Sequence, residues 1–274
     1  MATSNAESMD FFEKVGYSFG LWNESWEAFK LNVWTFVVLY LVPIGLTILL
    51  VTFYLLPLAA SAADKTALAA GTAIIAVILT LLTIFVSIVF YPALIITQLE
   101  SVKGNKISLS EAFNGGLNYV LRFIIAGLIG FVIVGGPIII SLLLMFVLIG
   151  FVLLPFALLW AVVATFFLFL TPYIIITQNL DAVSAIKKSY ETTRRKWQWV
   201  LALYTITALL SIVSSVPVIG GLAGLVGTII FFCLPAIIYL RHITPAEKAP
   251  ASSTQKSKAS PKKPKRKATT KKSA

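Results

Sequence analysis

Long uncharged stretches divide the chain, and their lengths predict how many helices cross a membrane. No Asp, Glu, Lys or Arg occurs at positions 31–63, 66–99, 123–180 or 197–240. A helix needs about 20 apolar residues to cross roughly 30 Å of hydrocarbon. The first two stretches therefore predict one helix each, and the last two predict two each. The expected fold is all-α, a polytopic membrane bundle of six transmembrane helices.

A short phrase recurs at the end of every second predicted span. Residues 92–98 read Pro-Ala-Leu-Ile-Ile-Thr-Gln, and residues 172–178 read Pro-Tyr-Ile-Ile-Ile-Thr-Gln. A weaker copy, Pro-Ala-Ile-Ile-Tyr-Leu-Arg, begins at Pro235. Three copies indicate a repeated structural unit. Because proline removes a helix hydrogen bond and clashes with the preceding turn, Pro92, Pro172 and Pro235 are expected to kink their helices.

Amphipathic segments precede the predicted hairpins. Near the N-terminus, apolar residues recur at spacings of three and four, which predicts a helix that Gly16 and Gly20 interrupt: Phe12, Val15, Phe19, Trp22, Trp26 and Phe29. This helix either lies in the membrane interface or packs against the bundle. Ser108 and Glu111 have the spacing of a capping box. They predict a short helix whose membrane-facing residues are Leu109, Phe113, Leu117 and Val120.

Residues 181–196 show the strongest amphipathic pattern in the chain. Their predicted apolar face consists of Val183, Ile186, Tyr190, Thr193 and Trp197. Each of the three units is thus an interfacial helix followed by a transmembrane hairpin, and the units are parallel repeats. The turn of the second hairpin is expected between Gly150 and Pro155, and its second helix is expected to end in the phrase at 172–178.

The distribution of Lys and Arg predicts the orientation of the chain. Ten basic residues fall on one side of the predicted spans and only Lys65 on the other: Lys14, Lys30, Lys103, Lys106, Lys187, Lys188, Arg194, Arg195, Lys196 and Arg241. By the positive-inside rule, both termini are cytoplasmic and the protein is a multi-pass protein of the cytoplasmic membrane. The predicted domains are a cytoplasmic N-terminal segment at 1–32, the transmembrane domain at 33–243 and a tail at 244–274.

Much of the formal net charge of +11 lies in the tail, which carries ten of the 22 Lys and Arg residues. The tail has no aromatic residue and no Val, Ile or Leu, so it is expected to be disordered and to bind polyanions without sequence preference. Elsewhere, seven basic residues are expected either to contact anionic lipid headgroups or to fix the topology: Arg122, Lys187, Lys188, Arg194, Arg195, Lys196 and Arg241.

The segment 181–199, with Ala185-Ile-Lys-Lys-Ser-Tyr-Glu-Thr-Thr-Arg-Arg-Lys-Trp197, resembles an element of bacterial six-helix membrane proteins. These are the YciC-like proteins and the membrane domain attached to some glycerophosphoryl diester phosphodiesterases. The segment Ser25-Trp-Glu-Ala-Phe-Lys30 looks like a variant of the same element. The resemblance covers most of residues 10–243 and implies a six-helix membrane fold. It carries no catalytic residues, and the barrel domain of the phosphodiesterases is absent.

Candidate chemistry is sparse within the predicted spans. One histidine, one cysteine and no acidic residue in any span argue against an enzyme, a metal site or a bound cofactor. Four polar residues of the repeated phrase would edge a cavity or merely cap helix ends: Thr97, Gln98, Thr177 and Gln178. The expected role is non-enzymatic, organising or assisting in the envelope through lipid and protein contacts. The alternative is a permease or lipid-handling transporter with a cavity between the even-numbered helices, whereas a bundle closed by aromatic residues would favour the accessory role.

Overall fold

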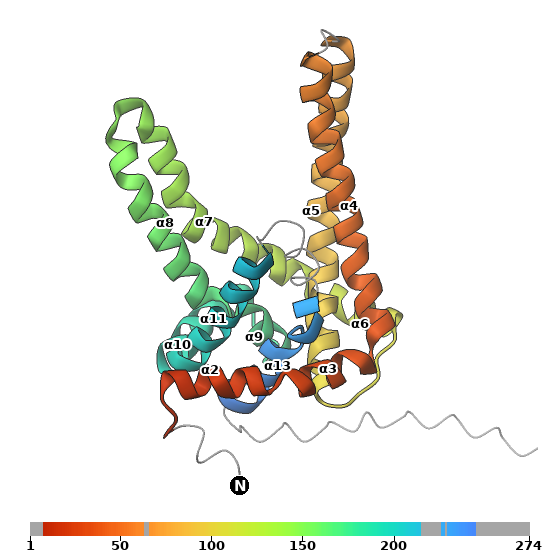
Figure 1. Cartoon of the computed structure of the whole chain (residues 1–274), viewed down its shortest axis with the longest axis vertical. Coiled ribbons are helices and arrows are strands. Elements are labelled where there is room, and N and C mark those ends of the chain that lie inside the picture. Colours follow the sequence, from red (N-terminus) through yellow and green to blue (C-terminus); the bar gives the residue numbers. More distant parts are fainter. Residues whose placement is uncertain (1–7, 63–65, 215–225, 228, 245–274) are drawn as a thin grey trace, which may run out of the picture. The chain divides into compact units, whose positions relative to one another are not determined.

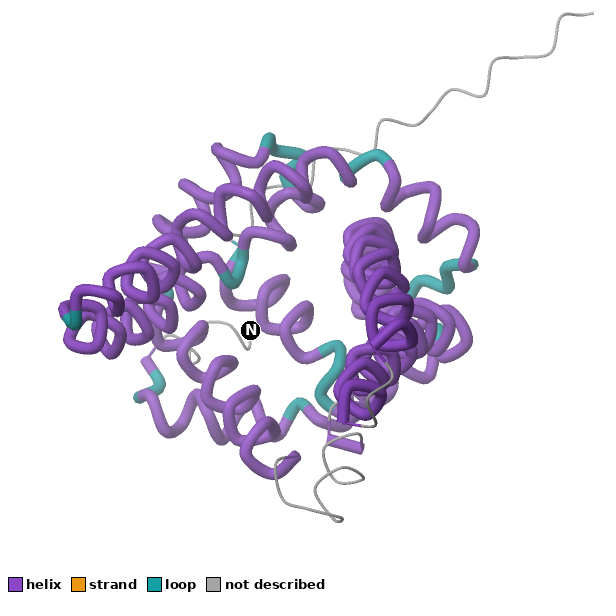
Figure 2. The backbone as a smooth tube through the Cα atoms, turned by 90° about the horizontal axis from the view of Figure 1, so that it is seen from above, coloured by secondary structure: helices purple, strands orange, loops and turns teal. Residues whose placement is uncertain are grey.

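The structure is a computed structural model that describes residues 8–62, 66–214, 226–227 and 229–244. In this part of the chain the secondary structure is helical, and Figure 2 shows the helices joined by short loops, with no strand among the described residues. The predicted all-α fold is confirmed. The predicted tail lies outside the described residues.

Two long antiparallel pairs dominate the described chain (Figure 1). They are α4 (Val33–Ala62) with α5 (Thr66–Val102), and α7 (Val120–Leu144) with α8 (Ile149–Leu168). Within the described residues, four helical segments are long and apolar enough to cross a membrane: Val33–Leu55, Gly71–Val102, Val120–Val147 and Ile149–Thr177. Large side chains along them are exposed, as lipid-facing residues are expected to be: Trp34, Phe85, Phe131 and Phe151. The described residues therefore contain four apolar helices that could cross a membrane, as in a membrane protein.

The stretch 197–240 contains only shorter apolar helices among its described residues. They are α11 (Trp197–Ser214) and a helical segment at Leu234–Ile243. Residues 215–225 and 228, which connect these two segments in the sequence, lie outside the described part. The six-span count consequently stays a prediction.

The turn of the second hairpin comes earlier than predicted. It is formed by η1 (Met145–Val147) and by Leu148, whose φ of 66° is left-handed. Gly150 already belongs to α8, and a Cβ atom there would lie 2.1 Å from the Ser141 carbonyl oxygen. A glycine is thus required at position 150 by the close approach of two helices. In the sequence it resembles a turn residue because it lies five residues before Pro155.

Four short helices gather at one end of the two hairpins (Figure 1). They are α2 (Phe11–Gly20), α3 (Trp22–Leu31), α6 (Leu109–Leu117) and α10 (Ala182–Arg195), hereafter the elbow helices. The predicted interruption is confirmed after Gly20, at Leu21, but it is wrong at Gly16, which lies inside the continuous helix α2. The capping box of Ser108 and Glu111 is also confirmed, and α2 has a second one from Asp10 and Glu13.

The repeated prolines do not act alike. Pro92 lies inside the continuous helix α5. Pro172 instead lies in the first turn of a separate helix, α9 (Thr171–Thr177). The apolar segment Ile149–Thr177 ends in the second phrase as predicted, but it is interrupted between α8 and α9. Pro235 likewise lies at the start of α13 (Leu234–Ile238), which passes into η2 (Tyr239–Ile243). Proline has no backbone N–H group. It is tolerated in the first turn of a helix, because an N–H group there has no intrahelical carbonyl to bind.

Candidate functional site

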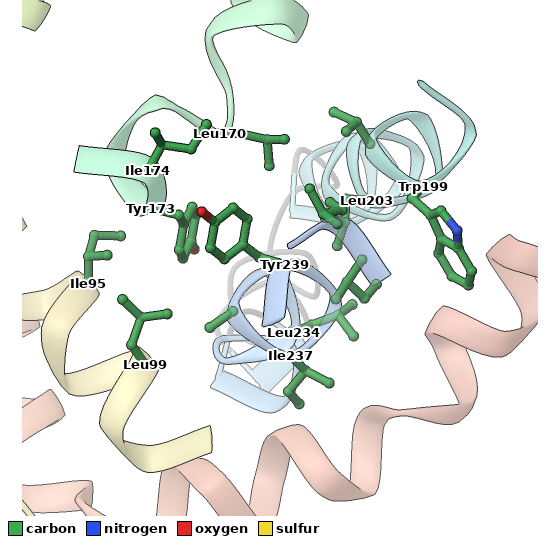
Figure 3. Packing of buried hydrophobic residues seen from close by; sticks show 14 of the residues in the cluster. Ile95, Leu99, Leu170, Tyr173, Ile174, Trp199, Leu203, Leu234, Ile237 and Tyr239 are labelled. Atoms are coloured by element: carbon green, nitrogen blue, oxygen red, sulfur yellow. The ribbon is translucent and has the colours of Figure 1, made fainter. Parts of the chain in front are cut away.

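The three copies of the repeated phrase meet in one buried cluster, here called the junction (Figure 3). The first copy contributes Ile95 and is followed by Leu99. The second and third copies contribute seven more members of the cluster: Tyr173, Ile174, Ile175, Ala236, Ile237, Ile238 and Tyr239. These side chains are at most 5% exposed. The phrase that recurs in the sequence is therefore the surface through which distant segments pack together.

Polar contacts connect the copies in pairs. The Tyr173 hydroxyl donates to Oε1 of Gln98 at 3.1 Å, and Nε2 of Gln98 donates to the Phe232 carbonyl at 3.1 Å. The Thr177 and Tyr239 hydroxyls lie 2.9 Å apart, and the Tyr173 and Tyr239 rings stack with centroids 5.3 Å apart. Because Gln98 is only 5% exposed, its amide satisfies two groups that have little access to water.

Gln98 and Ser25 bind backbone groups that have no partner within a helix, because the helix is interrupted at residues 231–233. In this turn the Cys233 N–H is donated to Oγ of Ser25 at 3.1 Å, and the Phe232 carbonyl accepts from Gln98. A side chain also binds the backbone at the break between α8 and α9, where the Ser189 hydroxyl donates to the Phe167 carbonyl at 2.7 Å. Side chains of neighbouring helices can satisfy backbone groups that a break exposes within a membrane.

The four residues predicted to edge a cavity have different roles. Gln98 and Thr177 each form a hydrogen bond with a tyrosine of the junction, Gln98 with Tyr173 and the exposed Thr177 with Tyr239. Thr97 is fully buried and donates to the Ala93 carbonyl of its own helix at 2.8 Å, while Gln178 is half-buried and caps the C-terminal end of α9. The helix-capping interpretation therefore applies to Gln178, Thr97 bonds only within its own helix, and bridging between elements applies to Gln98 and Thr177.

A cavity of about 420 Å³ lies beside the junction rather than at these four residues. Its wall is mainly apolar and comes from α5, α7, α8, α9 and α10, with Thr171 among the polar contributors. The buried Thr171 hydroxyl has no hydrogen-bond partner among the described residues. The lining consists of Ser87, Ile88, Tyr91, Phe123, Ala126, Gly127, Gly130, Leu168, Thr171, Pro172, Ile175 and Ile186.

The predicted headgroup residues also divide into groups. Lys187, Arg194 and Arg195 of α10 are exposed, whereas Lys188 and Lys196 are half-buried. Arg122 and Arg241 instead form contacts within the protein. The Arg122 guanidinium donates to Oδ1 of Asn179 at 2.5 Å and lies over the Tyr119 ring. Arg241 forms a salt bridge with Glu24 at 2.5 Å. They therefore join segments, in addition to any influence on topology.

Helix α10 docks through a face that the hydrophobic pattern did not indicate. Its buried residues are small and recur every three or four positions: Ala182, Ala185, Ser189 and Thr193. Of the predicted apolar face only Thr193 is buried, while Val183, Tyr190 and Trp197 are 48–61% exposed. Asp181 caps the helix, and hydrogen bonds from Ser184 lower the pKa of its carboxyl group. Helix α10 thus presents small residues to the protein and large apolar and basic residues away from it.

Other elbow helices use small residues in the same manner. Ala112 and Gly116 are the buried residues of α6. In α2 and α3 a regularly spaced row is buried: Lys14, Ser18, Leu21, Ser25 and Ala28. Small residues allow close approach of helix backbones within membranes. The N-terminal helices therefore pack on the bundle through this row and expose Phe12 and Trp22. Packing on the bundle, one of the two alternatives for this segment, is confirmed, and its place in the membrane interface stays a prediction.

Sequence reasoning missed several polar residues that position the elbows. Asn32 is buried between α3 and α4, and its amide donates to Oγ of Ser101 and the Asn105 carbonyl while accepting from the Ile107 N–H. These bonds hold the loop that precedes α6. No periodicity marks Asn32. Its place at the start of an apolar stretch was the available signal.

In the described residues, no group of three or more His, Cys, Asp or Glu side chains is placed to hold a metal ion. Comparisons with protein families, with curated proteins and with solved structures found no match to the chain. The resemblance to YciC-like proteins and to the phosphodiesterase membrane domain therefore stays a prediction.

Proposed function

We propose that this chain is a six-span protein of the cytoplasmic membrane, with both termini cytoplasmic, that organises or assists other envelope components without catalysing a reaction. In this proposal three parallel units, each an interfacial elbow followed by a hairpin, are joined at the junction. Its contacts to the surroundings are lipid headgroups, the bilayer and protein partners.

The arrangement of α10 carries the proposal. Its small residues pack inward, which leaves Val183, Tyr190 and Trp197 exposed beside the exposed cations Lys187 and Arg194. A helix with outward apolar and basic side chains suits the boundary between acyl chains and anionic headgroups. The elbow helices gather at one end of the hairpins, so they would share one membrane surface (Figure 1).

Aromatic packing at the centre of the junction also supports an accessory role. Tyr173 and Tyr239 stack at its centre, and a second aromatic cluster packs beside it, with Phe36 and Phe232 rings 5.0 Å apart. A transport route would need Gln98 at the edge of a cavity. Its side chain instead forms hydrogen bonds with the Tyr173 hydroxyl and the Phe232 carbonyl.

The second candidate function is lipid handling, and the cavity near Thr171 favours it. A mainly apolar space of about 420 Å³ between α5 and the α7–α8 hairpin suits part of an acyl chain. Enlarging Gly130 to leucine would occupy part of this space. Loss of a lipid-transfer activity in such a variant would support handling, whereas unchanged lipid distribution in cells lacking and expressing the protein would favour the accessory role.

Neutralising the outward cations of α10 is expected to reduce bound anionic lipid. The double variant Lys187→Gln, Arg194→Gln removes two charges, each contributing about 1 kcal/mol at an anionic surface. Phosphatidylglycerol retained by the protein purified in mild detergent should fall several-fold, as measured by native mass spectrometry.

The control for α10 is the double variant Lys30→Gln, Lys103→Gln. These lysines form exposed ion pairs with Glu27 and Glu100, so each site is already close to neutral. Retention should match that of the unmodified protein. Equal retention by the α10 variant would leave its cations with a topological role alone and would contradict the headgroup contact.

A further inference from the structure

A second cluster of cations surrounds a small cavity where α2 meets the α10–α11 connection. The cavity has a volume of about 210 Å³ and is lined by Lys14, Arg195, Lys196, Trp197, Gln198 and Trp199. Three of these six side chains are cationic. Sequence reasoning counted Lys14 only as a charge that favours the cytoplasmic side.

Lys14 is the unusual member of this cluster because it is only 3% exposed. Its ammonium group donates to the Met9 carbonyl at 2.6 Å and to Oε1 of Gln198 at 2.5 Å. It also lies 5.7 Å from the centroid of the Trp199 ring. These partners are neutral, and among the described residues no carboxylate lies within salt-bridge distance of Lys14.

Burial of an ammonium group without a counter-charge is unfavourable, so buried cations are normally paired. Two of the three donors of the Lys14 ammonium are used by neutral acceptors, which leaves one donor and the full positive charge. Arg195 adds a second cation to the same wall. The buried charge of Lys14 therefore indicates that the missing component of this site is an anion.

We propose that this cavity binds the phosphate group of an anionic phospholipid headgroup, with free phosphate as the other source of the same chemistry. The volume accommodates a phosphate with a few attached atoms. Trp197 and Trp199 suit the membrane interface, where tryptophan is enriched. The inference rests on the proposed membrane setting of the elbow helices and adds a defined ligand site to it.

The test uses the full chain in neutral detergent and follows heat-induced exposure of Cys233, which is buried and is the only cysteine of the sequence. The added probes are short-chain phosphatidylglycerol, a diacylglycerol of the same chain length and inorganic phosphate. Phosphatidylglycerol should raise the unfolding midpoint, and diacylglycerol should not. Stabilisation by inorganic phosphate would show that the site also accepts the free ion, and its failure to stabilise would identify the headgroup as the source.

Lys14→Met removes the charge and retains much of the side-chain volume. It should weaken phosphatidylglycerol binding about tenfold or more, the loss typical of one charge-assisted hydrogen bond. The matched control Lys30→Met should leave affinity unchanged. If Lys14 only anchors α2, the ligand-free midpoint of Lys14→Met will fall while affinity stays the same, and that result would overturn the site.

A second variant guards against misfolding. Arg195→Gln with Lys196→Gln keeps Lys14 in place and should also weaken binding; if Lys14→Met shows no unfolding transition, this variant decides. Unchanged affinity here, together with reduced lipid retention in the Lys187→Gln, Arg194→Gln variant, would overturn the phosphate site and leave the proposed function standing.

Discussion

Replacing Gln98 with leucine should destabilise the protein by about 2–4 kcal/mol. The substitution removes the donor to the Phe232 carbonyl and the acceptor of the Tyr173 hydroxyl, which lie in the buried junction. Each buried polar group left unpaired costs about 1–3 kcal/mol. The midpoint of Cys233 exposure on heating should fall by roughly 5–10 °C, given the usual shift per kcal/mol for a chain of this size.

Gln178→Leu is the matched control because Gln178 occupies the corresponding position of the second phrase. It is half-buried at the end of α9, so its replacement should shift the midpoint much less. Equal shifts in the two variants would mean that Gln98 does not bridge the three segments. A Tyr173→Phe variant should give an intermediate loss, since it removes only one of the two bonds.

Replacing Gly116 with alanine is expected to loosen the docking of α6 on α5. A Cβ atom at Gly116 would lie 2.8 Å from the Ala93 backbone nitrogen and 3.1 Å from its Cα atom. Backbone atoms cannot move aside as a flexible side chain can, and overpacking typically costs about 1–3 kcal/mol. The unfolding midpoint should fall by several degrees, although alanine favours helix more than glycine does.

Gly115→Ala provides the comparison one residue earlier in the same helix. Its Cβ would meet only the Cδ1 atom of Ile96, at 3.3 Å, which is the end of a flexible side chain. Its free energy of unfolding should therefore be unchanged or higher by up to about 1 kcal/mol, from helix propensity, and its midpoint should not fall. A decrease as large as that of Gly116→Ala would show that α6 does not pack on Ala93.

The elements that the sequence predicted well are those defined by spacing. The capping box placed the start of α6 after Ser108, and the alternation of apolar and charged residues placed α10 within a residue of its observed bounds. Length and lack of charge indicated the four long apolar helices. These signals are local, so they do not depend on which segments meet.

The packing faces and the roles of the polar residues depend on distant contacts and could not be predicted in the same way. The buried face of α10 consists of Ala182, Ala185, Ser189 and Thr193, whose weak hydrophobicity hid it behind larger neighbours. Gln98 and Gln178 have the same sequence context, yet only Gln98 faces the break at Phe232. The separate helix α9 was missed because Pro172 is compatible with a kinked or a newly started helix.

The number of membrane crossings tests the proposed architecture most directly. A reporter that is active only outside the cytoplasm should be fused after Val218, a position outside the described residues. Companion fusions after Gly150 and Lys188 serve as external and internal references. Six spans with cytoplasmic termini predict an external signal at Val218 and Gly150 and an internal one at Lys188. An internal signal at Val218 would limit the chain to its four long apolar helices and contradict the three-unit architecture.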